Sequence, residues 1–245
     1  MRETIRSLSN PKIRQTAALK EKKFRDKEGL FLVEGKKMVR EGISLGAEIV
    51  TVFATEKLAP EFPEDLTFPV SEEVFQKLSD EVSPEGVVAV LKKPEEDLAP
   101  ATETCLFLDG LRDPGNVGTI IRTAAACGVK RIFAANCCDC FSPKVIRSSM
   151  SGIYFVRVTE GDRSELLPLV SSLPVLVTDM AGENVFSAKV RKPFCLVVGS
   201  EAFGVSDELS AAASKTISLP MEKGVESLNA AISLSVILYT LINQR

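Results

Sequence analysis

Three glycine-rich stretches carry the side chains that could do chemistry. The first is DGLRDPGNVGTIIRTA at residues 109–124, the second is GSEAFG at 199–204, and the third is LPMEKGVESLN at 219–229. Their polar candidates are Asn116, Arg122, Glu201, Ser227 and Asn229. Glycine alone indicates only a tight turn, but three such loops holding five polar groups favour a functional site.

The first stretch invites a phosphate-site interpretation, because successive backbone N–H groups at the start of a helix attract anions. The residues that usually accompany such a phosphate site are missing. A P-loop needs Lys after the second glycine, whereas Gly118 is followed by Thr119. The dinucleotide pattern G-x-G-x-x-G is also absent, so neither an ATPase nor a Rossmann dehydrogenase is favoured.

The composition narrows the chemistry further. The 245 residues contain no histidine, which removes the usual general base, the Ser-His-Asp and Cys-His systems and His-ligated metals. Only Cys137, Cys138 and Cys140 cluster among six cysteines, so we expect reduced thiols and no metal site. Catalysis must rely on carboxylate, Arg, Lys, hydroxyl and amide groups.

Charge is distributed unevenly along the chain. Residues 1–45 hold 12 Lys and Arg against 6 Asp and Glu, a net charge of +6, and the rest, with 18 against 27, carries −9. A basic end on an acidic protein is typical of nucleic-acid contact, although lysines on a solvated helix face give the same pattern. No apolar run reaches the ~18 residues of a membrane span, and the start lacks the apolar core of a signal peptide, so we expect a cytoplasmic protein without membrane contact.

The elements that must position these groups fall into two parts. The acidic, Pro-containing stretch at 94–103 predicts a linker between a domain at 1–93 and a domain at 104–245. In the first part, the basic amphipathic stretch at 12–24 is followed by alternating strands and helices, which predicts a small α/β unit.

The second part repeats the strand and helix alternation more strongly, which predicts a mostly parallel sheet with helices on both faces. The candidate loops follow the expected strands at 105–109, 194–198 and 215–218. Ligands of such sheets bind beyond the carboxyl ends of the strands, so the three loops are expected to meet at one edge.

On these stretches the sequence resembles the SpoU/TrmH-type RNA ribose 2′-O-methyltransferases of the SPOUT superfamily. DPGNVGTIIRTA, GSEAFG and LPMEKGVESLN resemble the three motifs of that family, in order and at suitable spacing. The first part, with FLVEGKKMVREGI, is similar to the L30e-like substrate-binding domain often fused in front. The resemblance implies a deep trefoil knot in the second domain and a homodimer, neither of which periodicity shows.

The resemblance also assigns roles to residues. It implies S-adenosylmethionine as cofactor, held at Gly199, Leu219, Met221 and Leu228. The resemblance gives Arg122 the role of the base that removes the 2′-hydroxyl proton. Because a guanidinium stays protonated and is a poor base, we expect Arg122 instead to bind an RNA phosphate and orient the 2′-hydroxyl. Glu201 would fix Arg122 or its own loop, and Asn116, Ser227 and Asn229 would lock the geometry. Ser227 has an alternative interpretation as the cap of the helix that ESLNAAI opens.

The basic N-terminal segment supplies the expected RNA contacts, which are Lys12, Arg14, Lys22, Lys23 and Arg25. Such contacts position a folded RNA without reading its sequence. The two-domain arrangement favours ribosomal RNA as substrate. Transfer RNA and a non-catalytic RNA-binding role stay open as alternatives.

Overall fold

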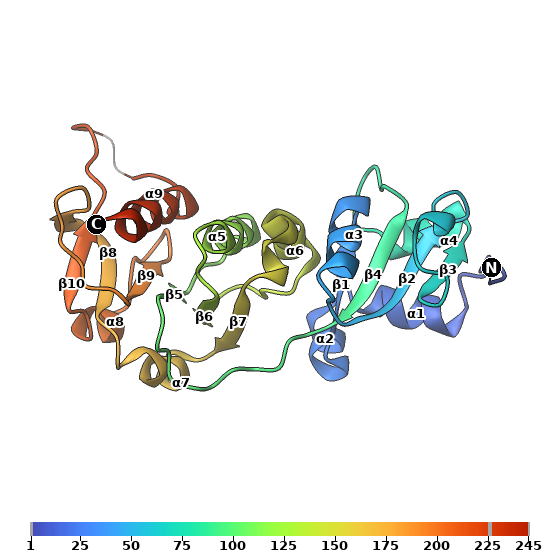
Figure 1. The fold of residues 1–245 in the computed structure, drawn as a ribbon, viewed down its shortest axis with the longest axis horizontal. Coiled ribbons are helices and arrows are strands. Elements are labelled where there is room, and N and C mark those ends of the chain that lie inside the picture. Colours follow the sequence, from blue (N-terminus) through green and yellow to red (C-terminus); the bar gives the residue numbers. More distant parts are fainter. Residues whose placement is uncertain (1, 225–226, 245) are drawn as a thin grey trace. The chain divides into compact units, whose positions relative to one another are not determined.

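The computed structural model describes residues 2–224 and 227–244, so Val225 and Glu226 of the third glycine-rich stretch lie outside the described residues. The chain divides into two compact units (Figure 1). Unit 1 comprises Met1–Pro94 with Phe141–Tyr154, and unit 2 comprises Glu95–Cys140 with Phe155–Arg245. Within the described ranges, no helix combines the length and apolar composition needed to cross a membrane.

Unit 1 is built on a four-stranded sheet with the order β1-β4-β2-β3. Its strands are β1 (Leu30–Glu34), β2 (Ile49–Thr55), β3 (Thr67–Val70) and β4 (Val87–Lys92). β4 runs antiparallel to β1 and β2, whereas β3 runs parallel to β2. The helices are α1 (Pro11–Ala18), α2 (Lys22–Glu28), α3 (Lys36–Ser44), α4 (Glu72–Leu78) and α6 (Pro143–Ser149), with 3-10 helices η1 (Ala59–Glu61) and η2 (Met150–Tyr154).

The basic stretch at 12–24 forms two helices. Asn10 caps α1 by accepting a hydrogen bond from the backbone N–H of Lys12 at 2.9 Å, and the chain turns at 19–21 before α2 begins. Ile13 is buried in the core of unit 1, while Lys12 and Arg14 are exposed on the same helix. The helix therefore holds two cations at defined positions on the surface.

Unit 2 contains a six-stranded sheet with the order β10-β8-β9-β5-β6-β7, in which every neighbouring pair is parallel. The strands are β5 (Cys105–Asp109), β6 (Arg131–Ala135), β7 (Arg157–Gly161), β8 (Val175–Asn184), β9 (Cys195–Gly199) and β10 (Lys215–Ser218). The helices are α5 (Pro114–Ala126), α7 (Arg163–Leu166), η3 (Leu167–Val170), α8 (Asp207–Ala211) and α9 (Ala230–Asn243).

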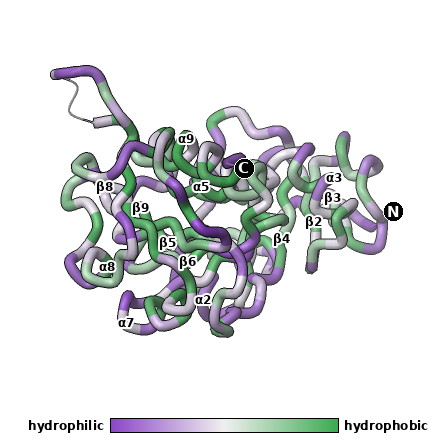
Figure 2. The backbone as a smooth tube through the Cα atoms, turned by 60° about the vertical axis from the view of Figure 1, so that its left-hand side comes forward, coloured by the Kyte–Doolittle hydropathy of each residue, from purple (hydrophilic) through white to green (hydrophobic). Residues whose placement is uncertain are grey.

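Helices cover both faces of this sheet. On one face, Leu166, Val170 and Leu209 from α7, η3 and α8 share a core with alternate residues of the central strands. On the other face, α9 packs against α5 and against β9 (Figure 1). Figure 2 shows hydrophobic residues concentrated in the central strands and in α9. The predicted α/β class, with a mostly parallel sheet and a smaller N-terminal unit, is confirmed.

Two elements of unit 2 differ from expectation. The pattern of residues 164–173 predicts one helix, but Pro168 lacks the N–H that a continuing α-helix needs, and the chain changes to the 3-10 helix η3. The apolar run at 174–180 predicts a strand, and β8 extends beyond it to Asn184. Thr216 of β10 pairs with Val177 and the next residue, Ile217, pairs with Glu183, so residues 178–182 protrude from the pairing.

Candidate active site

The carboxyl ends of β5, β9 and β10 place the candidate loops at one edge of the unit 2 sheet. Asp109 at the end of β5 pairs with Gly199 at the end of β9. β10 ends nearby at Ser218, where the third loop begins, and β8 lies between β9 and β10. The protruding residues 178–182 of β8 belong to this same edge, and no motif in the sequence marks them.

Asn116 joins the three loops through its side-chain amide. Its Nδ2 donates a hydrogen bond to Glu201 Oε1 in the second loop, and its Oδ1 accepts one from Asn229 Nδ2 at 2.7 Å in the third. Asn116 is 9% exposed, whereas Glu201 and Asn229 are exposed, so the two hydrogen bonds are partly buried. A buried amide with both ends satisfied by other loops fixes their relative positions.

Helix capping explains why these amides are so well placed. Asp113 caps α5 and accepts a hydrogen bond from the backbone N–H of Asn116 at 2.8 Å, with Pro114 at the first helical position. Asn229 caps α9, and its Oδ1 accepts from the backbone N–H groups of Ala231 and Ile232 at 3.0 and 3.2 Å. The cap of α9 is therefore Asn229 and not Ser227, which is exposed.

Glu201 binds Asn116 and not Arg122. Arg122 lies with Thr119 and Ala126 on the exposed face of α5, at helical spacings of three and four, whereas Asn116 lies on the buried face. Arg122 forms no ion pair or side-chain hydrogen bond with any residue in the described ranges. Its guanidinium is thus available to an external anion. Of the two roles expected for Glu201, the contact with Asn116 fits the holding of a loop and not of Arg122.

Gly199 is needed for a close approach between two parts of the second loop. An ideal Cβ at this position would lie 2.1 Å from the backbone carbonyl carbon of Gly204 and 2.3 Å from the nitrogen of Val205. Ser200 and Gly204 exchange backbone hydrogen bonds at 2.8 and 3.0 Å, which close the turn. Any side chain at Gly199 would push this turn away from the sheet edge.

Asp109 is a site residue that the motif analysis left without a role. It is 1% exposed at the end of β5, pairs with the guanidinium of Arg163, and accepts from the backbone N–H of Ser206 at 2.8 Å. The hydrogen bond to Asp109 raises the pKa of Arg163. The carboxylate therefore ties the second loop to the central strand. A buried strand ending in Asp, as in CLFLD, is the sequence signal that could have identified it.

The expected cofactor residues lie along the same edge. Leu219 and Met221 are half-buried after β10, and Leu228 is 44% exposed just before α9. Phe203 in the second loop is 92% exposed. Apolar side chains beside turns rich in backbone polar groups suit a ligand with a flat heterocycle and an alkyl sulfur chain.

The cysteine cluster has no features of a metal or nucleophile site. Burial raises the pKa of Cys137 to about 12 and that of Cys138 to about 11, and it raises the pKa of Cys140 strongly. Across the described residues, no group of three or more His, Cys, Asp or Glu side chains is placed to hold a metal ion. The thiols are therefore protonated at neutral pH.

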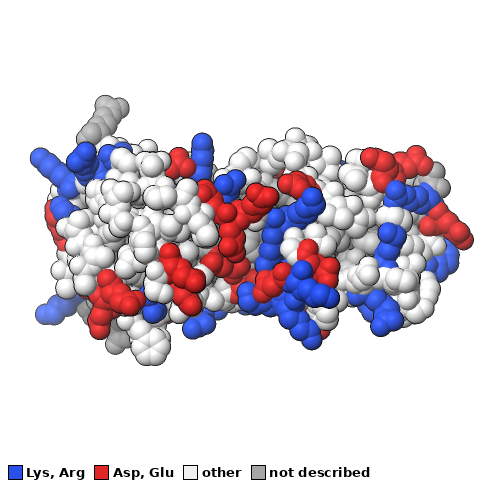
Figure 3. Space-filling view, turned by 90° about the horizontal axis from the view of Figure 1, so that it is seen from below, with Lys and Arg blue, Asp and Glu red and all other residues white. Residues whose placement is uncertain are grey.

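The expected RNA contacts in unit 1 are placed unequally. Lys12, Arg14, Lys22 and Lys23 are exposed on α1 and α2, and Lys and Arg side chains gather over these helices in Figure 3. Arg25 is 3% exposed, and its guanidinium donates to the backbone carbonyl of Leu19 at 2.6 Å. Its expected role at a phosphate is corrected, because it is buried between the two helices.

The parallel sheet of unit 2 thus has a side-chain hydrogen-bond network that joins three loops at its carboxyl edge, where ligands of such sheets bind. The profile of the SpoU rRNA Methylase family matches residues 103–239, and that of the MRM3-like substrate binding domain matches residues 10–89. The chain therefore belongs to the SpoU rRNA methylase family and is a methyltransferase.

Known proteins resemble the chain over nearly its whole length. An uncharacterised tRNA/rRNA methyltransferase of Synechocystis is 31% identical, covering 96% of this chain and 92% of the relative. The 23S rRNA (guanosine(2553)-2′-O)-methyltransferase RlmP of Bacillus subtilis is 28% identical over 97% and 98% of the two chains. The crystal structure of AdoMet-bound rRNA methyltransferase from Sinorhizobium meliloti superposes with a TM-score of 0.88 at 28% identity, covering 98% and 97%.

Proposed function

We propose that the chain methylates a ribose 2′-hydroxyl of ribosomal RNA, with S-adenosylmethionine as the methyl donor. The observation that carries this proposal is the Asn116 amide, which joins all three family motifs in one hydrogen-bonded network with Glu201 and Asn229. Relatives that share the whole two-part chain include a 23S rRNA 2′-O-methyltransferase and an AdoMet-bound rRNA methyltransferase.

The edge residues fit the cofactor. Leu219, Met221 and Leu228 offer apolar contacts, and the tight turn that Gly199 permits presents backbone groups to an adenine. When bound, S-adenosylmethionine supplies an electrophilic methyl group on a positively charged sulfur. The Glu201 carboxylate is already hydrogen-bonded to Asn116, so this proposal assigns it no contact with the sulfonium.

The chain contributes alignment and charge. Arg122 has a free guanidinium that grips the phosphate beside the target ribose with two parallel hydrogen bonds, which orients the 2′-hydroxyl. Arg122 does not remove the hydroxyl proton, which passes to an RNA phosphate oxygen or to water. The network of Asn116, Glu201 and Asn229 holds the loops still, and Ser227 lies on the loop that this network anchors.

Unit 1 supplies RNA affinity in this proposal. Residues 1–93 bind the substrate, residues 94–103 link the parts, and residues 104–245 carry the methyltransferase domain. Lys12, Arg14, Lys22 and Lys23 are exposed cations suited to phosphate contacts, although Lys22 and Lys23 also pair with Asp26 and Glu21. Such contacts add affinity that falls with salt. Because the substrate is ribosomal RNA, we place the protein in the cytoplasm.

We further propose that the active form is a homodimer. Ile232, Val236 and Tyr239 form an apolar stripe on α9 and are 52%, 37% and 47% exposed. Their spacing of four and three residues places them on one helical face, which is wide enough to pair with a second copy. Charged side chains are missing from this stripe, as expected for a covered surface.

The trefoil knot is also a proposal. α9 packs against α5 and β9, and Gln244 just after it donates to the backbone carbonyl of Val185 at 3.1 Å. The loop after β8 therefore lies against the C-terminal helix. Gly182 marks a separate close approach, between β8 and β10, because an ideal Cβ there would lie 2.6 Å from the carbonyl carbon of Ile217.

The experiment is methyl transfer to separated RNA pools. The protein is incubated with labelled S-adenosylmethionine and either ribosomal or transfer RNA, and label is expected in ribosomal RNA. Label in transfer RNA alone would support the transfer RNA alternative. Cofactor binding without label in either pool would favour a non-catalytic RNA-binding protein.

A further inference from the structure

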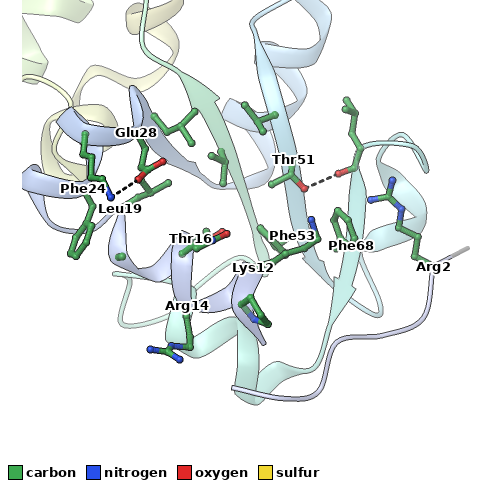
Figure 4. Close-up of a pocket in the computed structure, with 18 of the residues that line it drawn as sticks. Arg2, Lys12, Arg14, Thr16, Leu19, Phe24, Glu28, Thr51, Phe53 and Phe68 are labelled. Atoms are coloured by element: carbon green, nitrogen blue, oxygen red, sulfur yellow. Dashed lines mark hydrogen bonds and ion pairs between the residues drawn. The ribbon is translucent and has the colours of Figure 1, made fainter. Parts of the chain in front are cut away.

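Unit 1 contains an open groove of about 820 Å³ (Figure 4). It lies between α1 and α2 on one side and the strands β2 and β3 on the other. Ligand sites typically occupy ~300–1,000 Å³. The groove is therefore large enough for a nucleotide, and no step of methyl transfer uses it.

The groove has aromatic and apolar walls. Phe53, which is 1% exposed, forms part of the floor and stacks on Phe68 with ring centroids 5.8 Å apart. Figure 4 shows Phe68 toward one end and Phe24 at the other, with Leu19 beside Phe24. Flat aromatic faces separated by apolar floor are the surface on which an unpaired base stacks.

Two cationic side chains form cation–π contacts with the Phe68 ring. The Arg2 guanidinium lies 3.9 Å from the centre of the Phe68 ring, and Lys12 Nζ lies 5.0 Å from it. Arg2 is held there because Ile5 pairs with β3, donating to the Pro69 carbonyl at 2.9 Å. A guanidinium plane is itself a stacking partner for a base, and both cations attract the phosphate beside it.

The charge on the groove is positive. Its lining contains Arg2, Lys12, Arg14 and Lys27 against Glu28 and Asp65. Lys27 pairs with Glu28 at 3.5 Å, while Lys12 and Arg14 form no ion pair with the described residues. Two cations that form no ion pair with the described residues therefore flank the apolar floor, and this arrangement complements a phosphate joined to a base.

We propose that this groove binds an unpaired nucleotide of the RNA substrate, with its base on the aromatic and apolar floor and its phosphate at Lys12 and Arg14. This inference rests on the proposed function and names a structural feature of the substrate, a single-stranded or bulged residue. A regular duplex does not fit, since its bases are stacked within the helix and their flat faces are not available to the aromatic walls.

The first test measures binding of a uridine-rich single-stranded RNA with one 2-aminopurine, using the full chain. Its fluorescence falls when the base stacks on the protein. We expect Phe24→Leu/Phe68→Leu to weaken binding about 5- to 100-fold and to abolish the fluorescence change. Phe155→Leu, at a 54% exposed aromatic residue outside the groove, is the matched control. Equal affinity and quenching in the groove variant would overturn the proposal.

The second test uses exposed positions at which folding is not at risk. Lys12→Gln/Arg14→Gln should lower the slope of log affinity against log salt by roughly 0.7 for each lost contact. Lys57→Gln, at an exposed lysine that does not line the groove, should leave the slope unchanged. An unchanged slope in the double variant, or equal binding of the single strand and its duplex, would contradict the proposal.

The outcomes separate this inference from the methyltransferase proposal. If the wild-type chain methylates ribosomal RNA and the Phe24→Leu/Phe68→Leu variant does so with unchanged KM, the groove proposal fails alone. If no RNA is methylated but the groove variants lose single-strand binding, the proposed function fails alone. If the double Phe variant instead changes the oligomeric state, the groove is an interface between copies and the proposal is overturned.

Discussion

Asn116 and Asn229, which are separated by 113 positions in the chain, are joined by a hydrogen bond of 2.7 Å between their side-chain amides. The same Asn229 caps α9, and the same Asn116 follows the cap of α5. The two helices that pack against each other are thus tied at their N-termini by the residues that also hold the Glu201 loop. Stability of the helices and geometry of the site depend on one network.

Replacing Asn116 by Ala should lower kcat/KM for RNA about 10- to 100-fold, because a hydrogen bond to the Glu201 carboxylate is lost and Asn229 loses its partner. The fall is expected mainly in kcat, with a lower thermal midpoint. Asn243→Ala removes an exposed amide elsewhere on α9 and serves as control. Wild-type kcat in a folded Asn116→Ala protein would show that the network has no part in catalysis.

Substituting Arg122 by Lys should keep the charge but lose the paired hydrogen bonds to phosphate, so turnover should fall about tenfold or more while cofactor affinity stays within about twofold. Steady-state kinetics and calorimetric titration of S-adenosylmethionine measure the two effects. Arg191→Lys, at another exposed arginine of unit 2, controls for the exchange itself. Retained turnover in Arg122→Lys would mean that a point charge suffices.

The stripe of Ile232, Val236 and Tyr239 predicts a dimer that a buried charge disrupts. Val236→Lys should weaken self-association about tenfold or more, because an ammonium would be desolvated without a partner. Light scattering after size-exclusion chromatography measures the mass across concentrations. Ser164→Lys adds the same charge at an exposed site in α7 and should not change it. A monomeric wild-type chain would refute the dimer directly.

Cys138 should react slowly with iodoacetamide at pH 8. With its pKa raised to about 11, roughly 200-fold fewer thiolates exist than in the unfolded chain, where the pKa is ~8.5. The raised pKa of Cys138 also makes stability depend on pH, because the thiol ionises at lower pH in the unfolded chain than in the folded one. The thiol's contribution to the free energy of unfolding is complete below the unfolded pKa and is lost as pH rises through about 11. Peptide mapping of alkylation in folded and urea-unfolded chains measures the ratio, and equal rates would contradict the burial.

The sequence was sufficient to predict that the three loops lie at one edge of the sheet. It was not sufficient to predict the hydrogen-bond partners of each side chain. The loops after β5, β9 and β10 could be placed at one edge because parallel strands end on the same side. Nothing local indicated that Glu201 would bind Asn116 and leave Arg122 exposed, because that depends on how α5 is rotated against the sheet. The burial of Arg25 likewise follows from the break between α1 and α2, which a basic amphipathic pattern does not reveal.

Residues 178–182 show a further limit of sequence patterns. Their protrusion arises from a shift in pairing between β8 and β10, and long-range pairing is not encoded in the periodicity of either strand. The groove in unit 1 also combines residues from the N-terminus, two helices and the sheet, so only the folded chain brings Arg2 and Lys12 to Phe68.

The most direct test of the central claim is the position of the transferred methyl group. Ribosomal RNA methylated with labelled S-adenosylmethionine is digested to nucleosides for mass spectrometry, and a parallel sample is treated with alkali. The account predicts label on a 2′-O-methylated nucleoside, an alkali-resistant phosphodiester at one site, and about 10- to 100-fold slower formation of both with Asn116→Ala. Label on a base, with every phosphodiester cleaved by alkali, would contradict it.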